Sequence, residues 1–191
     1  MKRGFLDGGA RHLEGLKYCA GELGIDSSWE VISYEPTPES FVIAQGERAS
    51  LGFAVDLRNA ALWREAGAIQ LWTEAEDATG YGNTVMMAPG RSVDGRDMRA
   101  THLVVADDVN SVLGEFVRLG CTEVHVKLDI EGAEFEVLPR ILSSPHLGLV
   151  RTLRVEWHER FFVTELPAYS ARRADLTEAL RRRSIEVIDH W

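Results

Sequence analysis

The sequence predicts an α/β protein in which residues 1–191 form a single domain built on a doubly wound, mostly parallel β-sheet. Short apolar segments typical of strands alternate along the chain with segments in which apolar residues recur at helical spacing. Strands separated by helices form parallel βαβ units, so helices are expected on both faces of the sheet. The length of 191 residues, with 45% hydrophobic and 27% charged residues, suits one domain with its own core.

Two strand–helix pairs and a third strand are predicted in the first third of the chain. The expected elements are a strand around 5–6, a helix over 13–23, a strand over 29–34, a helix over 38–45 and a strand over 49–55. Leu16, Ala20 and Leu23 give the first helix its apolar spacing. Pro38 suits the first turn of the second helix, because that position needs no backbone N–H.

After a predicted hairpin, the remaining chain continues to alternate strands and helices. The expected elements are a hairpin of 68–73 and 101–106, a helix over 109–119, a strand over 124–130, a helix over 133–142, a strand over 149–157, a helix over 171–183 and a strand over 185–188. Asp107 or Asp108 is expected to cap the helix that follows, since a carboxylate accepts hydrogen bonds from free backbone N–H groups. Residues 80–97 are rich in glycine and charge and are predicted to form a loop insertion near the ligand site.

Charge and composition exclude several classes of partner. The net charge is −9, from 21 basic and 30 acidic residues, so a nucleic acid would be repelled. The sequence has no apolar stretch of about 18 residues and no secretory leader in residues 1–10, which predicts a cytoplasmic protein with no membrane partner. Cys19 and Cys121 are expected to be free core thiols of a reducing compartment.

Polar side chains occupy one face of the two strands predicted over 124–130 and 149–157. These residues are His125, Lys127, Asp129, Arg154, Glu156 and His158, and Glu131 follows at the next turn. Central parallel strands are usually apolar on both faces, and ligands bind beyond their carboxyl ends. The pattern therefore predicts a catalytic or metal-binding cup at this edge of the sheet.

Three interpretations of this cup stay open. In one, a divalent cation such as Mg²⁺ is held, together with water, by Asp129, Glu131, Glu156 and His158. In another, His158 or Asp129 takes a proton from a substrate hydroxyl, and Lys127 tunes the carboxylates or fixes the acceptor. In the third there is no ligand, and Lys127 and Arg154 neutralise the carboxylates in an ion network.

A cofactor-binding edge is predicted at the ends of the first three strands. Glycines in the turn Asp7-Gly8-Gly9-Ala10 let the backbone come close to a ligand. Glu35, followed by Pro36, closes the second strand, where an acidic side chain binds both hydroxyls of a ribose. Backbone groups of Asn59 and Ala60, after the third strand, are expected to meet an adenine edge.

These features suit a nicotinamide dinucleotide as well as S-adenosylmethionine. The Gly-x-Gly-x-x-Gly pattern is absent, because Leu13 and Glu14 stand where its last glycine should be, so a pyrophosphate would be poorly held. S-adenosylmethionine carries no phosphate, and its methionine ammonium is expected to meet a carboxylate such as Asp7. A reductase is disfavoured further because the sequence has no Tyr-x-x-x-Lys pair.

The segment Val126-Lys127-Leu128-Asp129-Ile130-Glu131-Gly132-Ala133-Glu134 resembles the signature of the FkbM-type methyltransferases. Further segments are similar to motifs of that family in the same order, namely Phe5–Ala10, Tyr34–Pro36, Asn59–Leu62 and Val155–His158. The similarity covers roughly residues 5–160.

The resemblance implies a Rossmann-like fold of the class I methyltransferase type. It also implies methyl transfer from S-adenosylmethionine to a hydroxyl of a sugar or secondary metabolite, so the partner would be a small-molecule or glycan acceptor. By position in the motifs, Asp7, Gly9 and Glu35 would bind the cofactor, and Asp129, Glu131 and His158 would face the acceptor.

The chain departs from the family at two positions and in its last strands. The family usually has Asn after Gly-Ala and a glycine two positions later, where this chain has Arg11 and Leu13. The predicted elements stop at a sixth strand, so the last strand of the full sheet is expected to be missing and the open edge to favour a homodimer. The departures favour an alternative, a degenerate methyltransferase fold that acts as a binding or partner subunit.

Overall fold

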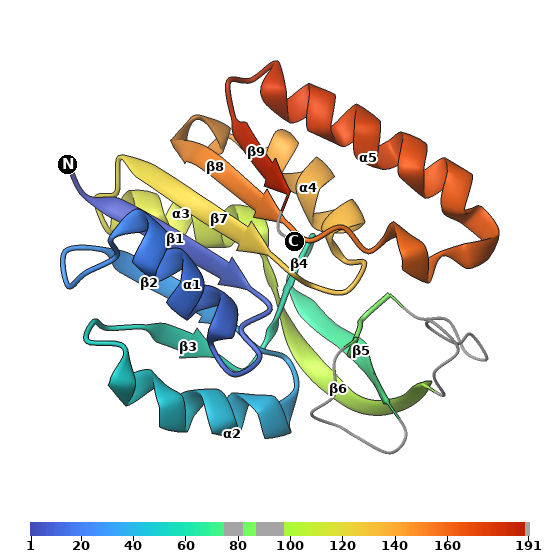
Figure 1. The fold of residues 1–191 in the computed structure, drawn as a ribbon, viewed down its shortest axis with the longest axis horizontal. Coiled ribbons are helices and arrows are strands. Elements are labelled where there is room, and N and C mark those ends of the chain that lie inside the picture. Colours follow the sequence, from blue (N-terminus) through green and yellow to red (C-terminus); the bar gives the residue numbers. More distant parts are fainter. Residues whose placement is uncertain (75–81, 87–97, 190–191) are drawn as a thin grey trace.

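A six-stranded, wholly parallel sheet forms the centre of the computed structural model, which describes residues 1–74, 82–86 and 98–189 (Figure 1). Its strands are β1 (Arg3–Gly8), β2 (Glu30–Tyr34), β3 (Asp56–Arg58), β7 (Glu123–Leu128), β8 (Val150–Val155) and β9 (Glu186–Asp189). They lie in the order β3-β2-β1-β7-β8-β9. The chain moves outward from β1 in one direction and from β7 in the other, so the topological switch point lies between these two strands.

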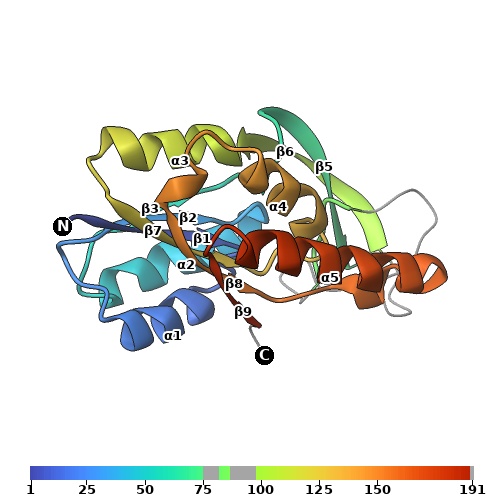
Figure 2. The same ribbon diagram turned by 90° about the horizontal axis from the view of Figure 1, so that it is seen from above.

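Helices cover both faces of this sheet (Figures 1 and 2). α1 (Glu14–Leu23) and α2 (Pro38–Glu47) lie on one face, and α3 (Val109–Arg118) and α4 (Glu134–Leu142) lie on the other. α5 (Leu166–Arg181) joins β8 to β9 and packs against α4 and β9. The predicted doubly wound, Rossmann-like α/β fold is therefore confirmed. No helix among the described residues is long and apolar enough to cross a membrane.

A second sheet of three strands lies beside the carboxyl ends of the first (Figure 1). β4 (Ala61–Trp63) is parallel to β6 (Met98–Asp108), and β5 (Gly67–Glu74) is antiparallel to it. The predicted hairpin corresponds to β5 and β6 and is confirmed. Asp108 caps α3, because its carboxylate accepts a hydrogen bond from the Asn110 N–H at 3.0 Å. β4 has no counterpart among the predicted elements, because three residues are too few to display a period.

The prediction of a strand over 49–55 is wrong. Arg48–Ser50 form a 3₁₀ turn, and Gly52 has a φ of 74°, a left-handed conformation that interrupts an extended strand. Phe53 packs against the core without joining the sheet. The third strand forms at Asp56–Arg58 instead, where it pairs with β2.

Two apolar clusters hold the helices on the sheet. The larger one joins one face of the sheet to α3 and α4 through buried side chains such as Phe116 and Phe135. The smaller one joins the other face to α1 and α2 and includes Leu16 and Ala44. Cys19 and Cys121 are free and buried, as predicted.

α1 comes closest to the sheet at Gly15, above the side chain of Lys127 on β7. A Cβ atom at position 15 would collide with Cε of Lys127. This lysine cannot move aside freely, because its Nζ donates to the carbonyl oxygen of Gly9 at 2.8 Å and lies 3.2 Å from Oδ1 of Asp7. The packing of α1 on β7 therefore requires a residue without a side chain at position 15.

We predict that Gly15→Ala destabilises the protein by about 1–3 kcal/mol, because the added methyl group over-packs the space of Lys127. Gly21→Ala in the same helix is the matched control, since a Cβ there meets nothing within 4 Å. The control is expected to gain about 0.5–1 kcal/mol from the helix propensity of alanine. Denaturant unfolding measures both effects, and equal stability of the two variants would contradict the close packing.

Candidate functional site

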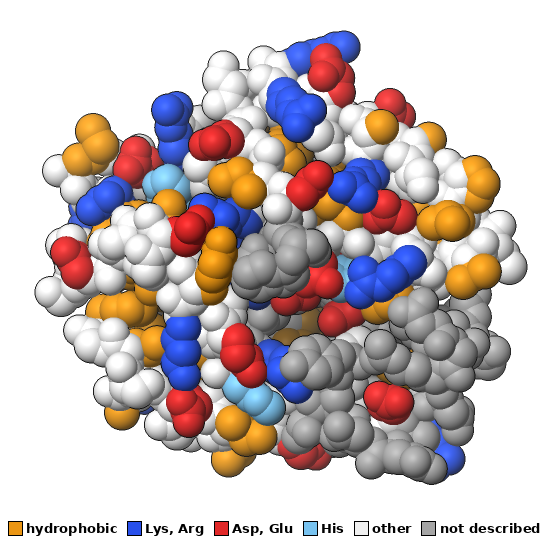
Figure 3. All heavy atoms as spheres, in the orientation of Figure 1, with side chains coloured by type: hydrophobic (Ala, Val, Ile, Leu, Met, Phe, Trp, Pro, Cys, Tyr) orange, Lys and Arg blue, Asp and Glu red, His pale blue; other side chains and the backbone are white. Residues whose placement is uncertain are grey.

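A pocket of about 450 Å³ opens at the carboxyl ends of β1, β2, β7 and β8, next to the switch point of the sheet. Its described lining includes five acidic residues, Glu14, Glu35, Asp129, Glu131 and Glu156, and three basic ones, Arg11, Lys127 and Arg160. In Figure 3, acidic side chains gather in a hollow near the centre of the face shown. The charge of this lining favours a ligand with positive charge.

The glycine turn after β1 forms one wall of the pocket. Gly9 has a φ of 85°, and a Cβ at this position would collide with the carbonyl oxygen of Asp129. The N–H groups of Gly9 and Ala10 both donate to the carbonyl oxygen of Tyr34, at 3.1 and 2.8 Å. The turn is therefore fixed between the ends of β7 and β2, and glycine is needed there for the approach of another backbone segment.

Glu35 closes β2 at the second wall of the pocket. It is almost fully buried, and its carboxylate accepts hydrogen bonds from the Arg11 N–H at 2.6 Å and from the Thr37 N–H at 2.8 Å. Burial raises the pKa of Glu35 to about 7 even though these hydrogen bonds favour the ionised form. Asn59 also holds this turn, because its side-chain amide donates to the carbonyl oxygens of Glu35 and Pro36 at 2.8 and 3.3 Å.

The start of α1 is a left-handed turn formed without glycine. Arg11 and Leu13 have φ values of 45° and 68°, which residues other than glycine rarely adopt. Leu13 is fully buried, so its packing offsets the cost of that backbone conformation. The carboxylate of Glu14 accepts a hydrogen bond from the His12 N–H at 3.1 Å. A negative charge thus already occupies the helix start, where a phosphate group would otherwise bind.

Lys127 and Asp7 form a buried ion pair between β7 and β1. The Nζ of Lys127 lies 3.2 Å from Oδ1 of Asp7 and 3.6 Å from Oδ2 of Asp129, and the hydroxyl of Ser33 donates to the other oxygen of Asp7 at 2.6 Å. Burial opposes the charge of Lys127, but Asp7 and Asp129 outweigh it and hold the pKa of this ammonium above its ordinary value. Asp7 lies outside the pocket lining, which is at odds with the ammonium-binding role predicted for it.

Three carboxylates surround one edge of the His158 ring beyond the ends of β7 and β8. The Nε2 of His158 lies 3.2 Å from Glu131, 3.4 Å from Glu156 and 3.9 Å from Asp129. Although burial disfavours the cation, the nearby carboxylates of Glu134, Glu156 and Glu131 raise the pKa of His158 to about 11. A ring that keeps its proton at neutral pH, and that does not line the pocket, is at odds with the proton-accepting role predicted for His158.

Burial favours the neutral form of the carboxyl groups in the same cluster. Burial raises the pKa of Glu131 to about 7 and also raises the pKa of Asp129. Glu131 has a φ of 55°, and Gly132 follows with a φ of 95°, so two left-handed residues turn the chain sharply from β7 into α4. This turn directs Glu131 back toward His158.

Glu134, in the first turn of α4, is a buried member of the site that sequence reasoning missed. Its carboxylate accepts hydrogen bonds from the His158 N–H at 2.7 Å and from the Gly132 N–H at 2.9 Å, and it lies 3.3 Å from Nδ1 of His158. The signal available in the sequence is an acidic residue at a helix start that follows a glycine turn. Nothing in the sequence indicates that this residue contacts the end of β8.

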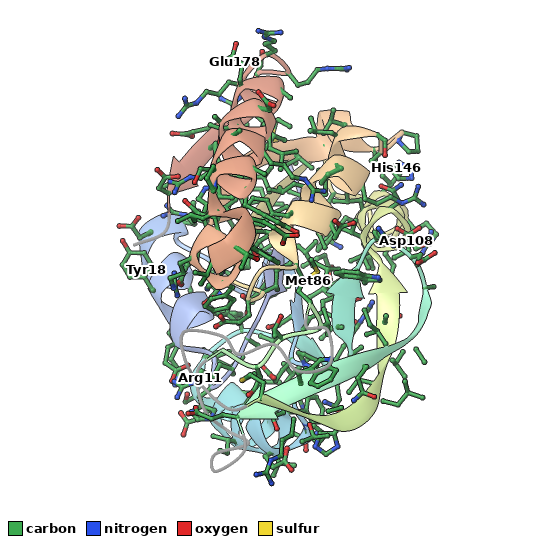
Figure 4. All side chains as sticks on the ribbon, turned by 90° about the vertical axis from the view of Figure 1, so that its right-hand side faces the viewer. Arg11, Tyr18, Met86, Asp108, His146 and Glu178 are labelled. Carbon is green, nitrogen blue, oxygen red and sulfur yellow. The ribbon has the colours of Figure 1, made fainter. Side chains whose placement is uncertain are left out.

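The segment 82–86 covers one side of the acidic cluster. The hydroxyl of Thr84 donates to the carbonyl oxygen of Glu131 at 2.6 Å, while the backbone of Thr84 pairs with Trp72 of β5. Figure 4, which looks onto this edge of the sheet, places Met86 near the centre and Arg11 to its left. Of the loop insertion predicted over 80–97, only 82–86 fall within the described residues, and Gly82 and Asn83 among them line the pocket.

The predicted cofactor-binding residues divide into two groups. Those that line the pocket are Gly9, Ala10, Glu35, Pro36 and Asp129. Those outside the lining are Asp7, Gly8, Asn59 and Ala60. The second group shapes or supports the turns of the first, as the contacts of Asp7 with Lys127 and of Asn59 with the turn after β2 illustrate. The prediction that Asn59 and Ala60 meet an adenine edge is therefore not supported by their position.

Comparison of the chain with protein-family models, with curated proteins and with solved structures finds no match.

We predict that Lys127→Met lowers the free energy of unfolding by about 3–5 kcal/mol, because Asp7 would stay buried without its partner. The double variant Asp7→Asn with Lys127→Met removes both charges and is expected to recover part of that loss. Urea unfolding at neutral pH gives the two values. A single variant as stable as the unmodified protein would show that the pair does not hold β1 and β7 together.

Proposed function

We propose that this protein binds S-adenosylmethionine in the pocket and transfers its methyl group to a hydroxyl of a small-molecule or glycan acceptor. The observation that carries the proposal is the acidic lining on both sides of the glycine turn, with Glu14 at the start of α1 and Glu35 at the end of β2. A dinucleotide would bring its pyrophosphate against these carboxylates, whereas S-adenosylmethionine brings a positively charged sulfonium and no phosphate. The resemblance of 126–134 to the FkbM-type signature supports the same function.

Glu35 would hold the ribose of the cofactor. Each oxygen of its carboxylate accepts one backbone N–H, from Arg11 or from Thr37, so a second lone pair on each remains for a hydroxyl. The φ of Leu13 is 68°, a left-handed conformation that glycine adopts without steric cost. This chain therefore differs from the family in the residue at position 13, but its backbone conformation there is one that glycine can also adopt.

The acceptor would lie between the cofactor and the ends of β7 and β8. Its hydroxyl oxygen would form a bond to the methyl carbon as the bond from that carbon to sulfur breaks, and S-adenosylhomocysteine would leave as a neutral thioether. The hydroxyl proton would pass to a carboxylate of the pocket, and Asp129 is the residue we assign to this role. Alignment of oxygen, carbon and sulfur in the closed pocket would supply much of the rate.

A binding or partner subunit without catalysis is the second candidate. The burial of Asp7 against Lys127 favours it, because no carboxylate of β1 is then left for the methionine part of the cofactor. A calorimetric titration with S-adenosylmethionine, followed by a test for methyl transfer to added acceptors, separates the two candidates. A cytoplasmic location belongs to either proposal, since both cysteines are free thiols.

We predict that S-adenosylmethionine binds the wild-type protein in a calorimetric titration and that Glu35→Gln weakens this binding about 10- to 100-fold. The reason is that the neutral amide binds the ribose hydroxyls more weakly than the ionised carboxylate, by about 1.4–2.7 kcal/mol in total. Glu47→Gln is the matched control, because that exposed residue at the end of α2 pairs with Lys17 and does not line the pocket. An unmodified protein that binds NAD⁺ and not S-adenosylmethionine would refute the proposal.

We predict that the affinity for S-adenosylmethionine rises as the pH increases from about 6 to about 8. The pKa of Glu35 is raised to about 7, so this carboxyl group loses its proton over that interval. Ribose hydroxyl groups donate more strongly to the ionised carboxylate, so binding is linked to proton release and strengthens at higher pH. Titrations at several pH values test the sign, and an affinity that falls with pH would contradict the role of Glu35.

A further inference from the structure

The cluster at the ends of β7 and β8 has the spacing of a metal centre. One ligand atom each from Asp129, Glu156 and His158 lie within 4.8 Å of one another. Atoms bound to a common divalent ion at about 2.1 Å are about 3.0–3.4 Å apart when they occupy neighbouring positions. The Nε2 of His158 lies 3.4 Å from Glu156 and 3.9 Å from Asp129, and also 3.2 Å from Glu131, so small rotations of the side chains would bring these atoms onto one ion.

The ring of His158 is aimed into this cluster without making a hydrogen bond there. The side chain is fully buried, and neither Nδ1 nor Nε2 makes a hydrogen bond among the described residues. The same holds, within the described parts of the chain, for Oε2 of Glu131. Buried polar atoms normally have partners. A nitrogen and carboxylate oxygens that converge on one point without bonding to each other have the arrangement that a metal ion requires.

Glu134 supplies a second and independent indication. It is fully buried, lies 3.3 Å from Nδ1 of His158, and is held by hydrogen bonds from the N–H groups of Gly132 and His158. A histidine that binds a metal usually donates its other ring N–H to such a carboxylate, which fixes the tautomer and the direction of the ring. A metal ion would displace the proton from Nε2, leaving the remaining proton on Nδ1 beside Glu134 and the lone pair of Nε2 directed at the three other carboxylates.

The carboxyl groups of the cluster outnumber the cationic side chains that the described residues place beside them. Four carboxylates, from Asp129, Glu131, Glu134 and Glu156, surround one imidazole ring. The nearest lysine, Lys127, is shared with Asp7. Arg160 lies 3.6 Å from Glu156, but its side chain is half exposed. Within the described residues, Lys127, Arg160 and the protonated ring of His158 face four carboxyl groups, so the ion network expected as the alternative accounts for part of the cluster.

We propose that Asp129, Glu156 and His158, with Glu131 as a further carboxylate, bind one divalent transition-metal ion, and that Glu134 is the residue that positions His158. An imidazole ligand together with carboxylates suits Mn²⁺, Fe²⁺, Co²⁺ or Zn²⁺ better than Mg²⁺ or Ca²⁺, which prefer oxygen ligands alone. Asp129, Glu131 and Glu156 line the pocket, so the remaining coordination positions of the ion would face it. In the proposed reaction, such an ion would hold the acceptor hydroxyl and ease its loss of a proton.

The test is a titration of Mn²⁺ into the metal-free protein, without cofactor or acceptor, followed by calorimetry and by the electron paramagnetic resonance signal of free Mn²⁺. We expect one equivalent to bind. Glu156→Gln and His158→Ala are expected to weaken this binding at least tenfold, and Glu134→Gln about 10- to 100-fold, the usual effect of losing a residue that orients a ligand. Glu178→Gln is the matched control, because it removes the same charge from the exposed surface of α5, and it should leave the affinity unchanged.

The absence of Mn²⁺ binding up to millimolar concentration would overturn the metal site, as would equal losses in Glu156→Gln and Glu178→Gln. Normal binding by a folded Glu134→Gln variant would overturn the positioning role. Thermal unfolding of each metal-free variant shows whether it has folded. Glu156 is partly exposed, so Glu156→Gln keeps the test decisive where the variants of buried residues do not fold. Because no S-adenosylmethionine is present, failure of the metal site and failure of the proposed methyl transfer are separate outcomes.

Discussion

The ammonium group of Lys127 lies at the switch point of the sheet and holds three parts of the molecule together. It contacts Asp7 on β1, the carbonyl oxygen of Gly9 in the following turn and Asp129 at the end of β7. The side chain is almost fully buried, so its charge depends on those partners, and each of them must stay in place. The close approach of α1 at Gly15 completes the enclosure of the lysine.

Lys127 holds both ends of the pocket in place, through the carbonyl oxygen of Gly9 and the carboxylate of Asp129. The glycine turn, which would form the cofactor end, is bonded to the carbonyl oxygen of Tyr34 on one side and packs against the backbone of Asp129 on the other. Asp129 also faces His158, so it belongs to the acidic cluster as well. A ligand at the glycine turn and an ion in the cluster would therefore lie on opposite sides of one residue whose position Lys127 sets. The geometry suits a reaction between two bound groups across a short distance.

The fold could be predicted from periodicity because most elements are long enough to display it. The segments that become β2, β7 and β8 and the helices α1 to α4 lie close to the predicted ranges. The third strand could not be placed, since Leu51 and Phe53 have the apolar alternation of a strand but pack against the core around Gly52. The short strand that forms instead, Asp56–Arg58, depends on pairing with β2, which a local pattern does not contain.

The sequence by itself determined the class of fold, the edge of the sheet where a ligand is expected, and the residue types present at that edge. These follow from local periodicity and from the rule that parallel strands end at one edge. Only the tertiary structure decided which of those side chains line the pocket and which are buried in ion pairs. It turned Asp7 inward to Lys127, left Glu35 on the pocket wall, and brought Glu134 from α4 against His158. The physical reason is that burial and ion pairing depend on contacts between residues far apart in the chain, and the spacing of residues along one strand or helix does not encode those contacts.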